Sequence, residues 1–315
     1  THLLDRNGPT ARQRPWPRVT VDEAAWASAA EQLAANRWSL LGLWGDDDCV
    51  HAAVRDAAAF AVLSLPCDRG GFPSLGRHHP PAIRLERAVR DLSGFEPRGL
   101  ADLRPWLDHG RWEAGSPLRQ NAPARGPATP YPFLPSEGES LHEIPVGPVH
   151  AGIIEPGHFR FTASGETVVR LEARLGYVHK GIEGLLAGCD QNRGATLAGR
   201  CSGDSTVAYA LAFAHAAEAA AGAEVPARAH WLRALMAELE RLANHLGDIG
   251  AICNDVGFAF AQMQCSRLRE AWQRDNHCVF GHRLLMDRVI PGGVSHDVNS
   301  EQAELLQRQH QVLAR

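Results

Sequence analysis

The chain has 315 residues, of which 44% are hydrophobic and 22% are charged. This length and composition exclude an intrinsically disordered protein and indicate about two globular domains. The net charge is −4 with the histidines neutral, which excludes a strongly basic nucleic-acid-binding surface. We therefore expect a folded protein with no nucleic-acid partner.

The sequence predicts neither a membrane-spanning helix nor a secretory leader. The most apolar stretch, residues 206–223, contains His215 and Glu218 and is too polar for a bilayer span. No basic-then-apolar signal pattern is present, so we expect neither secretion nor organelle import. The cysteines include no C-x-x-C pair, which suits free thiols in a reducing cytoplasm.

The first hundred residues predict a small domain of helices and strands. Residues 21–36 have Ala and Leu at helical spacing, and Asp22 can cap the start of this helix. Residues 84–92 predict a second helix, which Gly94 ends. Short apolar runs predict strands at residues 39–44, 49–54 and 60–65.

A linker and a hairpin are predicted next. Residues 113–135 are dense in Pro, Gly, Ala and Arg, which is typical of a linker. Beyond it, residues 158–161 and 167–174 flank a Gly-containing turn. In the second run apolar residues alternate with charged ones, which predicts a β-hairpin with one wet face.

The remainder predicts helices. Residues 228–250 carry apolar side chains at steps of three and four, and Gly250 can end this helix. Residues 258–286 predict another long helix, and Ser300 can cap a last one. The sequence thus predicts an α+β fold: a small N-terminal helix-plus-sheet domain, then a mainly α-helical domain that begins with a β-hairpin.

Several motifs after the predicted linker occur in an order typical of one protein family. They are EIPVGPVH at residues 143–150, EPGHFR at 155–160, YVHKGIE at 177–183, ELERL at 238–242 with His245 beyond it, and RLRE at 267–270. Together they resemble the large subunit of group 4, energy-converting nickel-iron hydrogenases, a family homologous to the quinone-site subunit of respiratory complex I.

A second resemblance lies upstream. LERAVRDLSGF at residues 85–95 is similar to the small peripheral partner subunit of complex I. Fusion of the two subunits is typical of formate-hydrogenlyase-type large subunits. The resemblance implies a complex I 30 kDa-subunit-like domain at residues 1–112, a linker at 113–135, and a C-terminally truncated 49 kDa-subunit-like domain at 136–315.

The metal site of this family is not matched. The family holds nickel and iron through two C-x-x-C pairs, because soft thiolates select these metals. Counting back from Val225-Pro226 without a gap places Ser202 and Ser205 at the first pair of ligand positions. A one-residue slip places Cys201 and Asp204 there instead, so the pair is lost in either alignment. We expect no cofactor in this chain.

Complex I uses the same cavity to bind a quinone. By the same gap-free counting, Ile154 replaces the quinone-binding histidine of the hairpin, and Gly203 replaces the tyrosine. A bound quinone is therefore not supported by its usual hydrogen-bond partners.

The resemblance also implies candidates for proton transfer. Glu155 corresponds to a glutamate that relays protons near the metal in hydrogenases, although a solvated loop carboxylate is the alternative. Glu238, Arg241 and His245 lie three and four residues apart and can contact one another on a helix. For these three residues, a structural ion-pair network is the alternative to a proton path.

The favoured interpretation is a hydrogenase-like subunit without its own nickel-iron centre. It would lie on the cytoplasmic side of the cytoplasmic membrane and contact an iron-sulfur small subunit and antiporter-like membrane subunits, with the iron-sulfur clusters in the partners. One alternative is an active nickel-iron hydrogenase whose other ligands lie beyond Arg315. Another is a structural or assembly module of the same complex.

Overall fold

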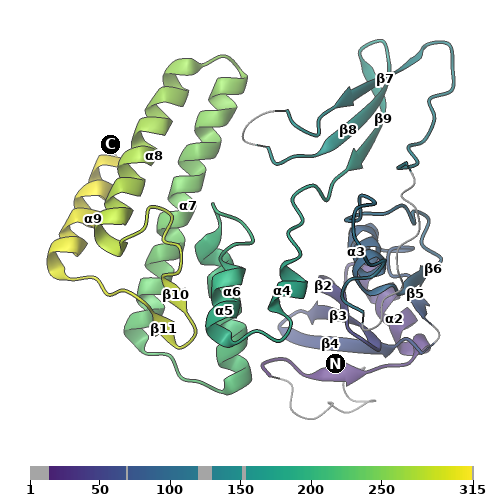
Figure 1. The fold of residues 1–315 in the computed structure, drawn as a ribbon, viewed down its shortest axis with the longest axis horizontal. Helices are drawn as coiled ribbons and strands as arrows, with labels where there is room; N and C mark the ends of the chain where they lie inside the picture. Colours follow the sequence, from purple (N-terminus) through teal and green to yellow (C-terminus); the bar gives the residue numbers. More distant parts are fainter. Residues whose placement is uncertain (1–13, 69, 120–129, 151–153, 314–315) are drawn as a thin grey trace. The chain divides into compact units, whose positions relative to one another are not determined.

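The computed structural model describes residues 14–68, 70–119, 130–150 and 154–313 (Figure 1). Contacts between Cα atoms divide the chain into residues 1–179 and residues 180–315, here called unit 1 and unit 2. The predicted domain borders at residues 112 and 136 rest on the resemblance and stay predictions. Part of the predicted linker lies outside the described residues.

Unit 1 begins with a four-stranded sheet in the order β1-β4-β3-β2, in which only β1 and β4 run parallel (Figure 1). Trp26 and Leu33 lie on the helix Glu23–Ala34, and Val89 lies on the helix Ile83–Ser93. These side chains share one core with Val50 and Leu63 of the sheet. The elements are β1 (Arg18–Thr20), α2 (Glu23–Ala34), β2 (Ser39–Gly45), β3 (Cys49–Asp56), β4 (Ala59–Pro66), β5 (Gly71–Pro73), a 3-10 turn (Pro80–Ala82), α3 (Ile83–Ser93) and β6 (Glu96–Arg98).

The local sequence signals account for these helices. The Ala25 amide donates to Asp22 Oδ1 at 2.8 Å, so Asp22 caps α2 as predicted. Gly94 ends α3 in the left-handed region at φ +73, which glycine adopts without steric cost. The predicted α+β fold is confirmed.

The rest of unit 1 is a three-stranded sheet of β7 (Leu141–Val146), β8 (His158–Ser164) and β9 (Thr167–Arg174). The predicted hairpin is present, and its exposed face is the apolar one. Leu171 is 53% exposed, whereas Glu172 and Arg174 are buried. Glu172 accepts a hydrogen bond from Arg104, and Arg174 donates to the main-chain oxygens of residues 105, 106 and 108. These bonds explain why charged side chains face inward.

Unit 2 is built around two long neighbouring helices, α7 and α8 (Figure 1). α7 does not end at Gly250 as predicted. This glycine instead lets α8 approach closely, because a Cβ atom there would lie 3.1 Å from Cys265 Cβ. α8 is also shorter than predicted, since Gly281 ends it at φ +75. The elements are α4 (Ile182–Leu186), α5 (Gln191–Ala198), α6 (Thr206–Ala221), α7 (Ala227–Asp255), α8 (Ala259–Phe280), β10 (Val289–Ile290), β11 (Gly293–Val294) and α9 (Ser300–Leu313).

Asn299, not Ser300, caps the last helix. The Gln302 amide donates to Asn299 Oδ1 at 2.9 Å, and the Asn299 amide donates to Gln302 Oε1 at 3.0 Å. This reciprocal pair is a capping box, so Ser300 becomes the first helical residue. Among the described helices, none combines the length and the apolar character that crossing a membrane requires.

A buried ion pair joins α6, α7 and the β10-β11 turn. Arg233 on α7 is 1% exposed and makes two hydrogen bonds to the Glu218 carboxylate on α6, at 2.5 and 3.1 Å. Arg233 also donates to the main-chain oxygens of Ile290 and Gly293, and Glu218 accepts from the Gly292 amide. The pair therefore connects the turn at residues 291–293 to α6 and α7.

Candidate functional site

The loop between α5 and α6 contains Ser202 and Ser205, the two predicted ligand positions. Ser202 Oγ donates a hydrogen bond to Asp204 Oδ1, and Ser205 Oγ lies 3.5 Å from the same oxygen. Before the loop, the Arg200 guanidinium binds both oxygens of Asp287, at 2.9 and 2.7 Å. The two hydroxyls at the expected ligand positions are thus joined to each other through one carboxylate.

Two side chains of α7 anchor this loop. Glu240 accepts hydrogen bonds from the amides of Val207 and Ala208, at 2.6 and 3.1 Å. These are free N–H groups of the first turn of α6, where a carboxylate is favoured by the helix dipole. Asn244 Nδ2 donates to the main-chain oxygen of Asp204 at 2.7 Å. Burial and the charge of Asp204 raise the pKa of Glu240.

The donor atoms of this loop do not fit a nickel-iron centre. Serine hydroxyls are hard, neutral donors, and both are hydrogen-bonded to Asp204. The neighbouring Cys201 is partly buried, and desolvation together with the Glu183 charge raises the pKa of its thiol. A raised pKa disfavours the thiolate, which is the form that binds metal. The absence of a nickel-iron centre from this chain stays a prediction.

The predicted group on α7 lies at the surface of unit 2. Arg241 Nη1 and Glu238 Oε1 form an ion pair in which both side chains are 58% exposed. His245 is also exposed and makes no hydrogen bond or ion pair within the described residues. The structure therefore brings together two of the three candidates, and their role in proton transfer stays a prediction.

The candidates before β8 lie in a loop of unit 1. Glu155 and Ile154 are exposed, and Ile154 retains 53% of its surface. Gly203, which replaces the quinone-binding tyrosine of complex I in our alignment, is exposed in unit 2. The role of Glu155 in proton transfer is not tested by this placement.

Two residues near the ligand positions were missed by the sequence interpretation: Glu240 and Asn244. The sequence did indicate that Glu240 is special. It lies four residues after Met236 and three before Ala243, which places it on the same helix face as both. Met236 and Ala243 are both buried. A carboxylate inside the apolar stripe of a helix needs a partner, and here the partner is the first turn of α6.

Replacing Glu240 by Ala is expected to destabilise the start of α6 by about 0.5–2 kcal/mol, the usual effect of removing a helix cap. Hydrogen exchange at the amides of Val207 and Ala208 measures this, and both should lose protection. The matched control is Glu238→Ala on the same helix, whose exposed carboxylate pairs only with Arg241 within the described structure. Equal protection in both variants would contradict the anchoring role.

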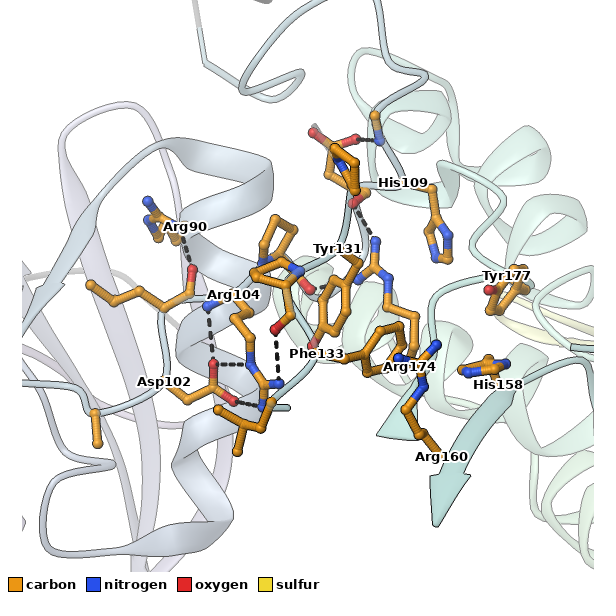
Figure 2. Close-up of a pocket in the computed structure, with 18 residues that line it drawn as sticks. Arg90, Asp102, Arg104, His109, Tyr131, Phe133, His158, Arg160, Arg174 and Tyr177 are labelled. Carbon is orange, nitrogen blue, oxygen red and sulfur yellow. Dashed lines mark hydrogen bonds and ion pairs between the residues drawn. The ribbon is translucent and has the colours of Figure 1, made fainter. Parts of the chain in front are cut away.

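Unit 1 contains a separate pocket of about 1070 Å³, here called the hairpin pocket (Figure 2). Residues 101–105, residues 130–134 and the strands β8 and β9 contribute to its wall. Figure 2 shows arginine, histidine and aromatic side chains gathered around it. The labelled side chains are Arg90, Asp102, Arg104, His109, Tyr131, Phe133, His158, Arg160, Arg174 and Tyr177.

Comparison with known proteins agrees with the two resemblances. Residues 19–128 match the family described as the 30 Kd subunit of respiratory-chain NADH dehydrogenase. Hydrogenase-4 component G of Escherichia coli K12 is 37% identical over 248 residues, which are 76% of this chain and 44% of that protein. Formate hydrogenlyase subunit 5 of the same organism is 34% identical over 247 residues, which are 75% of this chain and 43% of that protein.

A solved structure shares the fold. It is a chain of the membrane-bound sulfane sulfur reductase, an archaeal respiratory membrane complex, with a TM-score of 0.53 and 24% identity over 56% of this chain and 47% of that one. The present chain spans less than half the length of the curated relatives named above. Over the part that it spans, the chain is a hydrogenase-like, complex-I-like subunit.

Proposed function

We propose that this chain is a subunit of a membrane-associated oxidoreductase complex that supports electron and proton transfer without a nickel-iron centre of its own. In this proposal it lies peripherally on the cytoplasmic side of the membrane. Its partners are an iron-sulfur small subunit, which carries the clusters, and antiporter-like membrane subunits. The relatives named above are components of hydrogenases, and this supports membership in such a complex.

The observation that carries the proposal is the loop at residues 201–205. Ser202 and Ser205 share the Asp204 carboxylate, Asn244 binds the Asp204 oxygen, and Glu240 holds the first turn of α6 that follows the loop. Each of these contacts joins protein groups to one another, so the loop is held in place by the chain itself. A metal-dependent loop would instead direct thiolates toward a shared ion.

Metal analysis of the natively purified, full-length complex tests this proposal. We expect no stoichiometric nickel, because the loop offers hydroxyl oxygens where thiolates are required. One nickel ion per wild-type chain, together with hydrogen uptake or evolution, would overturn the proposal in favour of an active hydrogenase.

A purely structural or assembly role makes a different prediction. If the chain only organises its neighbours, its deletion should prevent the membrane subunits from assembling. If it supports electron and proton transfer, the Glu155→Gln and Glu238→Gln variants should assemble normally and lower the turnover of the complex. Blue native electrophoresis, followed by an activity measurement on the assembled complex, separates the two outcomes.

A further inference from the structure

The hairpin pocket has more cationic than acidic side chains in its wall. Arg90, Arg104, Arg160 and Arg174 line it, and the acidic lining residues are Asp102 and Asp108. Both Asp102 oxygens accept hydrogen bonds from Arg104, and Asp108 Oδ1 accepts from the Gly110 amide. The acidic groups therefore already have partners in the protein.

Three of the four arginines also have partners. Arg104 donates to Asp102 and Glu172, and Arg174 donates to the main-chain oxygens of residues 105, 106 and 108. Arg90 donates to Glu96 and to the Leu103 oxygen. These guanidinium groups hold the wall of the pocket together. They contribute positive charge to it but keep few donors for a ligand.

Arg160 is different. Its Nε atom is buried and has no hydrogen-bond partner in the part of the chain that the structure describes. Its nearest carboxylate is Glu143, at 3.6 Å from Nη1, which is longer than a hydrogen bond. The guanidinium stacks over Phe133 at 4.0 Å from the ring centroid, which fixes its plane. Arg160 thus presents an oriented guanidinium with a spare donor.

His158 adds a second group without a partner. It lies two residues before Arg160 on β8, so both side chains face the same side of the sheet. Its Nδ1 lies 3.3 Å from the Gly147 oxygen, while its buried Nε2 has no partner among the described residues. The His158 and Phe133 rings meet edge to face, with centroids 5.3 Å apart. Figure 2 shows His158, Arg160 and Phe133 next to one another at the pocket.

We propose that the hairpin pocket binds a phosphate-bearing ligand, with the phosphate held by the Arg160 guanidinium next to His158 and the organic part against Phe133, Tyr131 and Tyr177. The Arg160 side chain keeps 28% of its surface exposed, and its Nη1 lies 3.6 Å from Glu143, beyond hydrogen-bond distance, so its terminal nitrogens can donate to phosphate oxygens. The arginines of the wall favour a doubly charged group over a singly charged carboxylate. This inference does not depend on the proposed role in electron transfer.

Isothermal titration calorimetry on the full chain tests the proposal with four probes: inorganic phosphate, glycerol 3-phosphate, soluble dihexanoyl phosphatidic acid and acetate. We expect the phosphates to bind and acetate to bind more weakly. Equal affinity for the two phosphate esters identifies a soluble ligand, and tighter binding of the acylated probe identifies a lipid headgroup. Absence of phosphate binding, or acetate binding as tightly as phosphate, would overturn the proposal.

Variants locate the binding site. Arg160→Gln should weaken phosphate-ester binding by about 10- to 100-fold, the effect of losing a charged hydrogen bond. Arg55→Gln, an equal change of charge at an exposed position of β3, should leave the affinity unchanged. If Arg160→Gln lowers the thermal midpoint, Arg160→Lys keeps the charge without the planar fork, and it should bind with intermediate affinity. Equal affinity of wild type, Arg160→Lys and Arg160→Gln would exclude this pocket.

Discussion

Replacement of Arg233 by Met is expected to destabilise unit 2 by about 3–5 kcal/mol. The substitution preserves most of the side-chain volume but leaves the buried Glu218 carboxylate without its cation. It also removes the donors that bind the Ile290 and Gly293 oxygens. Hydrogen exchange followed by mass spectrometry should show the loss of protection in peptides from α6, α7 and the β10-β11 turn.

The matched control for this variant is Arg228→Met on the same helix. Arg228 pairs with Asp297, and both side chains are more than 60% exposed, so protection should not change. If the unit 2 peptides of Arg233→Met and Arg228→Met exchange hydrogen at the same rates, the buried pair does not contribute to the stability of unit 2. The double variant Arg233→Met/Glu218→Leu should recover part of the loss, because no uncompensated charge is then buried.

The Arg233–Glu218 pair makes the stability of unit 2 depend on pH. The hydrogen bonds from Arg233 hold the pKa of Glu218 below its usual value of 4.5. A carboxyl group with a lowered pKa in the folded state stabilises the fold above the unfolded-state pKa, and this contribution is lost as the pH falls through the lower folded-state pKa. Protection of α6 should therefore fall below about pH 4.5 in the wild type and depend less on pH in the double variant Arg233→Met/Glu218→Leu.

Replacement of Trp26 by Ala is expected to destabilise unit 1 by about 3–5 kcal/mol. Trp26 is 1% exposed, its Nε1 donates to the Pro73 oxygen at 2.9 Å, and its ring meets Phe72 edge to face. The variant loses the apolar contacts and leaves a cavity in the core. Peptides from β3, β4 and α2 should exchange faster, as measured in the same experiment.

The control for this variant is Trp231→Ala, since Trp231 is 78% exposed. Its substitution should leave the protection of unit 1 unchanged. Trp26→Phe should give a smaller loss than Trp26→Ala, because it keeps an aromatic ring beside Phe72 while it removes the donor to Pro73. Equal effects of Ala and Phe would mean that the hydrogen bond, and not the packing, dominates.

Local signals in the sequence predicted local structure well. The cap at Asp22, the stop at Gly94 and the strand runs depend on neighbours along the chain, and all of them are present. The predicted stop at Gly250 was wrong because a glycine has two uses, to end a helix or to let another helix approach. Only the position of Cys265 on α8 distinguishes between these uses.

The candidate sites were less predictable because they depend on partners far apart in the sequence. The alternation in β9 was read correctly as a hairpin, but it could not show that Glu172 and Arg174 face inward. Arg104, which binds Glu172, and the oxygens of residues 105, 106 and 108, which bind Arg174, lie more than sixty residues away. The motif resemblance located Ser202 and Ser205, whereas the contact between Glu240 and the first turn of α6 spans more than thirty residues.

The contact between Glu240 and the first turn of α6 affects how this part of the protein folds. Glu240 binds the Val207 and Ala208 amides, and Asn244 binds the Asp204 oxygen, so α7 supplies the attachment of the loop at residues 201–205. In proteins where a metal joins such segments, folding waits for delivery of the ion, and chelation undoes it. If the chain has no nickel-iron centre, as we propose, α6 and α7 reach their arrangement through these contacts without delivery of an ion. The attachment of the loop to α7 then depends on Asn244 and Glu240 and not on an ion.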